Sequence, residues 1–247
     1  MMNSRRAYIF YRLVFTGVCC IVLAGTYSCK QNKAAATVDN KTVPAAADTI
    51  NAKALLAISR AEKLLKDGAL VTRSDNDFES LTLQNFSKRD QSYSHSGIAF
   101  KEDGIYVVYH AMTGKENPDG ACRRDPFDSF VNPSMKTGFG IFQYQLSDTE
   151  KERLHSIMKK NHASKIPFDV TFNLKSNDSL YCSEMIYKGL KTATDGRVVL
   201  PSSYINNFRP KIMGYKYNHA FFKTFEYIGI DDLYMNPFCK EIIRVKY

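Results

Sequence analysis

The most informative pattern in this chain is a cysteine that begins a predicted helix. Cys182 follows the polar residues 175–179 and precedes apolar residues at helical spacing, so we expect it in or beside the first turn. The free N–H groups and the positive dipole end of a helix stabilise a thiolate, which is the nucleophilic form of cysteine. The same N–H groups can hold an oxyanion. Cys182 is therefore a candidate nucleophile for attack on a carbonyl carbon.

Two histidines upstream are candidates for the base that such a nucleophile needs. His95 begins the apolar run 95–100, and Gly97 would allow backbone or substrate to approach closely. His110 ends the next apolar run, and residues 101–104 between the two runs are typical of a hairpin turn. A cysteine nucleophile, a histidine base and a polar group that orients the base are thus all available.

The same residues also have simpler explanations. Free cysteines are often buried and inert, and a lone strand histidine is often structural. A metal site would draw on the same side chains, but no Cys-x-x-Cys or His-x-x-x-His pair links them, so we expect no metal and no cofactor. Glu184 is expected to brace the start of the helix or to pair with Lys188 rather than to act as an acid.

The runs Ser94-His95-Ser96-Gly97-Ile98 and Tyr181-Cys182-Ser183-Glu184, joined by the polar residue that ends the second strand, resemble a known family. It is the YiiX/YebB-like group of circularly permuted papain-like enzymes, which belongs to the NlpC superfamily and is related to lecithin:retinol acyltransferase. The resemblance covers roughly residues 68–234, a size typical of one domain. It implies an α+β, permuted papain-like (NlpC-type) fold with an antiparallel sheet packed against the helix that carries the nucleophilic cysteine.

The same resemblance implies the roles of individual residues. It places the nucleophile at Cys182, the base at His95 and the orienting group at His110. We expect the neighbouring residues to contact substrate, namely Tyr181, Ser94 and Gly97.

The N-terminal segment is typical of a lipoprotein-type signal peptide at residues 1–28. Arginines precede an apolar stretch at 13–24, and a small residue stands directly before Cys29, the expected lipidation site. Residues 29–47 lack periodicity and are expected to be a disordered tether, and residues 48–247 a single catalytic domain. We expect a protein that is exported to the cell envelope and lipid-anchored to a membrane, in the periplasm or at the outer membrane. Ordinary secretion or an uncleaved anchor is the alternative.

Cysteine usage leaves one question open. Outside the leader and Cys29, the chain has Cys122, Cys182 and Cys239, an odd number for an oxidising compartment. Either Cys122 and Cys239 form a disulfide and leave Cys182 free, or all three are unpaired.

The formal net charge of +9 bears on which classes of partner the protein could bind. Removing the leader removes Arg5, Arg6 and Arg12 and no acid, so the exported part remains basic. A basic surface favours an anionic partner such as membrane lipid or a cell-wall polymer, although a merely solvated basic surface is the simpler explanation. No dense lysine or arginine run suggests nucleic acid.

The remaining pattern predicts the elements that position these residues. We expect helices from about Thr49 to Lys66 and from the capping box of Ser147 and Glu150 to Asn161. Strands are expected at 69–72, 95–100, 105–110, 139–144, 225–230 and 241–247. Residues 113–136 show no regular pattern, and residues 73–93 are a candidate pocket wall or flexible cover. The aromatic segment 204–225 should supply core and an apolar wall near the cleft.

These observations favour an exported, membrane-tethered cysteine hydrolase. It would cleave an amide bond, in a cell-wall peptide or an N-acyl amine, through a Cys-His-polar triad. One alternative is a lipid-directed acyl hydrolase or acyltransferase, and another is a non-catalytic binding lipoprotein with a degenerate site.

Overall fold

The computed structural model describes residues 46–75, 83–114, 117–134, 136–208 and 222–247. All of them belong to the second of two units into which the chain divides, Val43–Tyr247. The expected signal peptide, Cys29 and most of the expected tether lie outside the described residues; Ala46 and Ala47 begin a helix. Within the described ranges, no helix is long and apolar enough to cross a bilayer.

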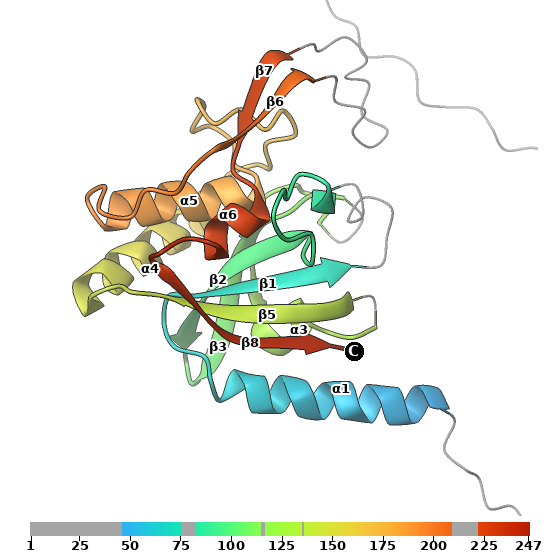
Figure 1. Cartoon of the computed structure of the whole chain (residues 1–247). Helices are drawn as coiled ribbons and strands as arrows, with labels where there is room; N and C mark the ends of the chain where they lie inside the picture. The colour runs from blue at the N-terminus through green and yellow to red at the C-terminus, as the bar shows by residue number, and fades with distance from the viewer. Residues whose placement is uncertain (1–45, 76–82, 115–116, 135, 209–221) are drawn as a thin grey trace, which may run out of the picture. The chain divides into compact units, whose positions relative to one another are not determined.

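The centre of the fold is a six-stranded antiparallel sheet with the strand order β4-β3-β2-β1-β5-β8 (Figure 1). Its strands are β1 (Ala69–Asp75), β2 (His95–Glu102), β3 (Ile105–Ala111), β4 (Cys122–Pro126), β5 (Lys136–Tyr144) and β8 (Cys239–Lys246). A separate two-stranded sheet pairs β6 (Ser203–Phe208) with β7 (Phe222–Tyr227).

Helices cover both faces of the large sheet. They are α1 (Ala46–Glu62), α3 (Phe127–Phe130), α4 (Asp148–Ala163), α5 (Cys182–Ala193) and α6 (Ile230–Tyr234). Helices α4 and α5 lie on one face, and α1 and α3 lie on the other (Figure 1). The predicted fold class is confirmed, because an antiparallel sheet packs against the helix that begins at Cys182.

The sheet separates two apolar cores, which show where each strand residue points. Ile98 of β2 packs with Ile186 of α5, whereas Ala99 packs with Phe130 of α3 on the opposite face. Successive strand residues alternate between faces, and paired residues on neighbouring strands share one. The register continues to the start of β2, where Arg73 pairs with His95. His95 therefore faces α3.

Two expectations about local structure differ from the fold. The segment 113–136 contains β4 and α3, because its polar residues pair with β3 at the sheet edge and so need no apolar alternation. The strand predicted at 225–230 ends at Tyr227, and a short helix begins at Ile230. At the start of that helix the Asp232 carboxylate accepts a hydrogen bond from the Gly229 N–H. A turn this short carries no periodic signal.

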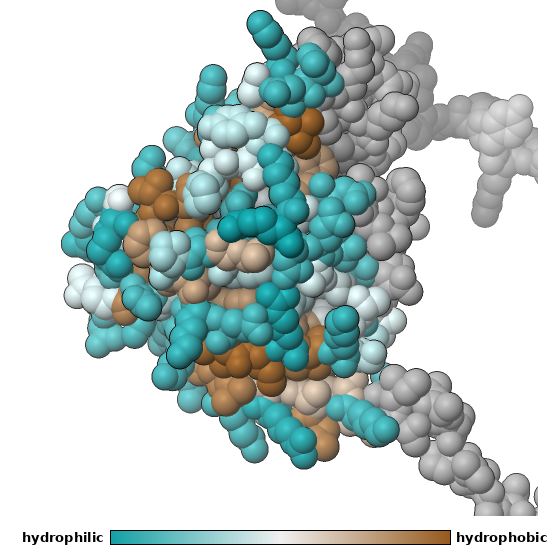
Figure 2. All heavy atoms as spheres, viewed as in Figure 1, coloured by the Kyte–Doolittle hydropathy of each residue, from teal (hydrophilic) through white to brown (hydrophobic). Residues whose placement is uncertain are grey.

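The predicted capping box of α4 is confirmed. The Ser147 hydroxyl accepts from the Glu150 N–H at 3.2 Å, and the Glu150 carboxylate accepts from the Ser147 N–H at 2.8 Å. On the surface, apolar atoms gather between β8 and α1 (Figure 2), the elements that carry the exposed side chains of Leu55, Leu56 and Ile242.

Candidate active site

Cys182 is the first residue of α5, as expected, and the helix start is braced from within. The Glu184 carboxylate accepts the N–H of Tyr181, which precedes the helix, at 3.1 Å. Its other oxygen lies 2.8 Å from the Lys188 ammonium. Glu184 thus makes both of the contacts expected of it.

The Cys182 thiol is nearly enclosed, with 7% of the residue exposed. Burial raises the pKa of the thiol, and the Ser96 hydroxyl together with the backbone of Ser183 and Ser96 offsets part of that rise. Cys182 is therefore a neutral thiol at pH 7. The effect of Ser96 on the thiol places the sulfur near β2, at the residue that follows His95.

On the other face of the sheet, two buried histidines and a half-buried carboxylate from three adjacent strands are joined by hydrogen bonds. The Nε2 atom of His95 lies 2.8 Å from the Nδ1 atom of His110, and the Nε2 atom of His110 lies 3.0 Å from Asp125 Oδ2. The Arg123 guanidinium binds the other carboxylate oxygen of Asp125 at 2.8 Å. The ring of Phe130 packs against both imidazoles.

The protonation states of His95, His110 and Asp125 follow from their surroundings. Burial, and then the nearby Arg73, hold the pKa of His95 well below 6.5. Burial likewise lowers the pKa of His110 to about 4, although Asp125 opposes the change. Burial alone would raise the pKa of Asp125, but hydrogen bonds from His110 and Arg123 outweigh it and keep the carboxylate ionised. At pH 7 both rings are neutral.

These charges fix which ring atoms carry hydrogen. The Asp125 carboxylate only accepts, so His110 donates from Nε2 and accepts at Nδ1. His95 must then donate from Nε2, which leaves the lone pair of its neutral ring on Nδ1. Nδ1 is therefore the ring atom of His95 that is able to accept a proton.

The structure brings His95 and His110 together but does not join His95 to the thiol. Ser96 faces α5 and Cys182, whereas His95 precedes it in the strand and faces α3. Between the described side chains of Cys182 and His95 there is no hydrogen bond. The expected contact of sulfur and imidazole is therefore not made in this conformation, because the pleat of β2 extends to its first residue.

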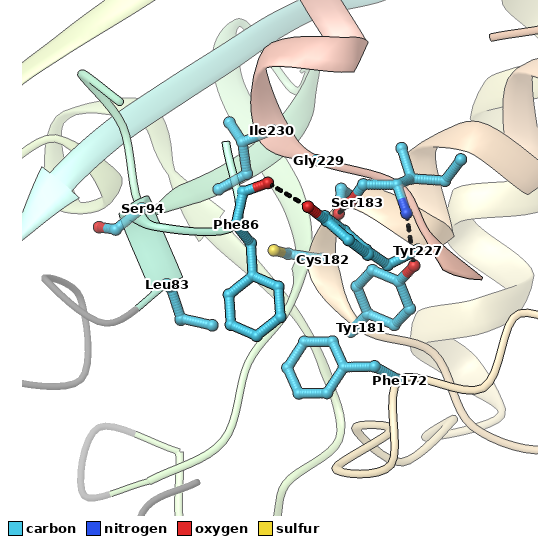
Figure 3. Close-up of a pocket in the computed structure, with 11 residues that line it drawn as sticks. Leu83, Phe86, Ser94, Phe172, Tyr181, Cys182, Ser183, Tyr227, Gly229 and Ile230 are labelled. Carbon is cyan, nitrogen blue, oxygen red and sulfur yellow. Dashed lines mark hydrogen bonds between the residues drawn. The ribbon is translucent and has the colours of Figure 1, made fainter. Parts of the chain in front are cut away.

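Two of the three predicted substrate residues lie beside the thiol. Tyr181 and Ser94 line a cavity of ≈ 30 Å³ with Cys182, and apolar side chains close it (Figure 3). Leu83 and Phe86 belong to that lining, in agreement with the expected wall at 73–93; the rest of the lining is Phe172, Ser183, Tyr227, Ile228, Gly229 and Ile230.

Gly97 is the exception, and its expected contact with substrate is corrected. It lies on the other face of β2, against β3. A Cβ there would lie 2.4 Å from a methyl carbon of Val108 and 2.9 Å from the Tyr109 carbonyl oxygen. Its missing side chain allows the strands that carry His95 and His110 to pack closely.

Asp125 and Phe172 were not anticipated. Asp125 lies in a stretch with no apolar alternation, and only the pairing of His110 with Arg123 across β3 and β4 brings it near the histidines. Phe172 lies in a loop whose shape depends on hydrogen bonds. The polar run Arg123-Arg124-Asp125 was a visible signal, but nothing local showed what it meets.

Of the two arrangements that the sequence left open for the cysteines, the structure has the unpaired one, since Cys122 and Cys239 are both free thiols. They lie on β4 and β8, the two edge strands of the sheet. Five strand spacings of about 4.8 Å separate those edges by roughly 24 Å, far beyond the reach of a disulfide. Across the described residues, no group of three or more His, Cys, Asp or Glu side chains is arranged to hold a metal ion.

The large antiparallel sheet, the cysteine at the start of α5 and the histidine on β2 together define a YiiX-like, NlpC-type fold. The crystal structure of metalloprotein YiiX from Escherichia coli O157:H7 is similar, with a TM-score of 0.56 and 15% sequence identity. The match covers 74% of this chain and 98% of that one. At this identity the likeness shows the fold alone. No protein-family model and no curated protein matches the sequence.

Proposed function

We propose that this protein is a cysteine hydrolase in which Cys182 is the nucleophile and His95 the base. One observation carries the proposal: His110 joins His95 to the Asp125 carboxylate, and this arrangement implies that the lone pair of the neutral His95 ring lies on Nδ1. The sulfur lies near Ser96, the next residue in the strand. Two buried histidines joined to a half-buried carboxylate are costly to maintain, and such groups cluster at functional sites.

The proposed reaction moves one proton twice. His95 takes the thiol proton of Cys182 at Nδ1, and the sulfur attacks the carbonyl carbon of the substrate. N–H groups at the start of α5 stabilise the oxyanion. The protonated His95 then gives its proton to the leaving amine, and water hydrolyses the thioester to free the acid and the thiol. His110 and Asp125 stabilise the imidazolium in between.

This reaction requires His95 to approach the sulfur. The pairing of β2 with β3 begins only at Ile98, so residues 95–97 are held by β1 alone. The start of β2 is thus the part of the strand with the fewest ladder hydrogen bonds, and in this proposal it shifts toward the thiol together with His110, so that the hydrogen bond between His95 Nε2 and His110 Nδ1 is kept. We assign the described arrangement to the resting enzyme.

The substrate class in this proposal is an amide, in a cell-wall peptide or an N-acyl amine. The likeness to YiiX supports the fold of such a hydrolase. Export and a lipid anchor on Cys29 belong to the same proposal, because residues 1–28 have the composition of a lipoprotein signal.

A binding protein without catalysis is the second candidate. It is favoured by the missing hydrogen bond between Cys182 and His95 and by the raised pKa of the buried thiol. In that case the aromatic cavity would hold a ligand, and the cysteine would be part of its wall.

Turnover separates these candidates. The full-length protein should be assayed against peptidoglycan fragments, N-acyl amines and acylated lipids, with Cys182→Ala as the control. The proposal expects hydrolysis of an amide substrate that Cys182→Ala abolishes. Cleavage of acyl lipids alone would favour the lipid-directed alternative. Binding without turnover in any assay would favour the second candidate.

A further inference from the structure

Phe172 separates two hollows that lie next to each other. One is the cavity of ≈ 30 Å³ at Cys182, and the other is a groove of ≈ 350 Å³. Among the described residues, Phe172 is the residue that lines both. The groove is otherwise lined by Thr171, Asn173, Leu174, Lys175, Tyr204, Thr224, Phe225 and Glu226. Phe172 is therefore the wall between the thiol and a larger, more polar space.

The backbone of Phe172 is held in an unusual conformation. Its φ is 53°, in the left-handed region that bulky residues rarely adopt. The buried carboxylate of Asp169 maintains it: one oxygen accepts from the Thr171 N–H at 2.8 Å, and the other accepts from the Asn173 N–H at 2.6 Å. Strain of this kind persists only where the surroundings enforce it, and it is concentrated at functional sites.

The ring of Phe172 is packed from several sides. Phe86 stacks parallel to it with 6.1 Å between ring centroids, and Tyr181 lies at 4.8 Å (Figure 3). Phe168 meets it edge to face at 6.0 Å. The loop thus directs an aromatic ring into the space beside the sulfur, and its neighbours fix it there.

We propose that Phe172 is a specificity-determining residue, which limits the acyl group at Cys182 to a small one and directs the polar remainder of the substrate into the groove. This inference rests on the proposed function. A cavity of ≈ 30 Å³ has room for about two water-sized groups, which suits a short acyl chain such as acetyl or alanyl. The groove offers Lys175, Glu226 and Asn173 to polar groups.

Thiol-reactive probes of graded size test the wall without requiring turnover. The full-length protein should be treated with methyl and with benzyl methanethiosulfonate, and labelling of Cys182 followed by peptide mass mapping. Each labelling rate is divided by the rate of the same reagent with a free model thiol. In the native protein we expect the ratio of the corrected methyl rate to the corrected benzyl rate to be at least about ten. Phe172→Ala should reduce that ratio to near one. Equal corrected rates in the native protein would overturn the inference.

Two further variants serve as a second test of the Phe172 ring and as a control in the groove. Phe172→Gly removes the ring and also tolerates the positive φ, so it should fold even if Phe172→Ala does not, and it should give the same low ratio. Thr224→Ala changes the groove at a residue outside the apolar cluster of Phe172, and its ratio should match the native one. A ratio unchanged by both Phe172 substitutions, or lowered equally by Thr224→Ala, would contradict the role of Phe172. If no substrate is hydrolysed but the ratio responds as expected, the proposed hydrolase function is contradicted, whereas the role of Phe172 in limiting the size of groups at Cys182 is supported.

Discussion

The Nε2 atom of His95 lies 2.8 Å from the Nδ1 atom of His110, and this contact links the start of β2 to a carboxylate on β4. Both rings are buried. Because Asp125 only accepts hydrogen bonds, the contact has a direction, with hydrogen on His95 Nε2 and the lone pair on Nδ1. The proposed chemistry depends on that direction.

Replacing Asp125 with Asn tests the far end of the chain. An amide can still accept from His110, but it carries no charge to stabilise the imidazolium. We expect kcat/KM for the amide substrate to fall by roughly 10²-fold, the scale of general acid–base effects. Arg123→Gln, which leaves the bond between His110 and Asp125 in place, should cost much less. Native activity in Asp125→Asn would exclude a role for the carboxylate.

The pKa of His110 predicts how stability depends on pH. The unfolded chain binds a proton on this ring below pH 6.5, but the folded protein does so only below about 4. Between these values the unfolded state holds more protons, so acidification favours unfolding, by up to about 3 kcal/mol for this group. Urea unfolding at pH 7 and pH 5 measures the effect. The free energy of unfolding of His110→Gln should change less; an identical pH dependence would show that His110 is not the cause.

Glu184 should act in the opposite direction. Burial raises the pKa of its carboxyl to about 7, although Lys188 and the Tyr181 N–H oppose this. The folded protein therefore retains a proton that the unfolded chain loses near pH 4.5, and this contribution to stability is lost as pH rises from 4.5 through 7. In Glu184→Gln that part of the pH dependence should disappear. Glu184→Ala should in addition lose the brace on α5, at about 1 kcal/mol. Curves of equal slope for the native protein and Glu184→Gln would refute the assignment.

The Tyr181 hydroxyl supports the wall of the cavity by accepting the Ile228 N–H at 2.9 Å. Tyr181→Phe leaves that buried N–H without a partner, which should lower the free energy of unfolding by about 1–3 kcal/mol. Tyr204→Phe is the matched control. Because Tyr204 is half exposed, this substitution should change the free energy of unfolding by no more than about 0.5 kcal/mol. Equal effects of the two substitutions in urea unfolding would contradict this account.

The sequence predicted those features that depend on local pattern. The hairpin of β2 and β3, the capping box of α4 and the position of Cys182 at the start of α5 all follow from turns, caps and periodicity. The contact of His95 with His110 follows from the hairpin, since the two lie on the same face of paired strands.

Features that depend on tertiary pairing were not predictable in this way. Asp125 meets His110 only because β4 pairs with β3, and Cys122 and Cys239 are far apart only because their strands form opposite edges. The face of β2 that meets α5 was likewise undetermined, because both faces of the strand are buried and the apolar pattern fits either. The expected contact of His95 with Cys182 follows from the family resemblance, and the pattern of β2 does not show which face His95 occupies.

The most direct test of the proposed base is the rate at which iodoacetamide alkylates Cys182, measured against pH in the native protein and in His95→Gln, with the site confirmed by peptide mapping. If His95 takes the thiol proton, the native protein should react at pH 7 at least about tenfold faster than the variant. That advantage should shrink as the pH approaches the range in which a free thiol ionises. Equal rates at every pH would show that the His95 imidazole does not act on the Cys182 sulfur.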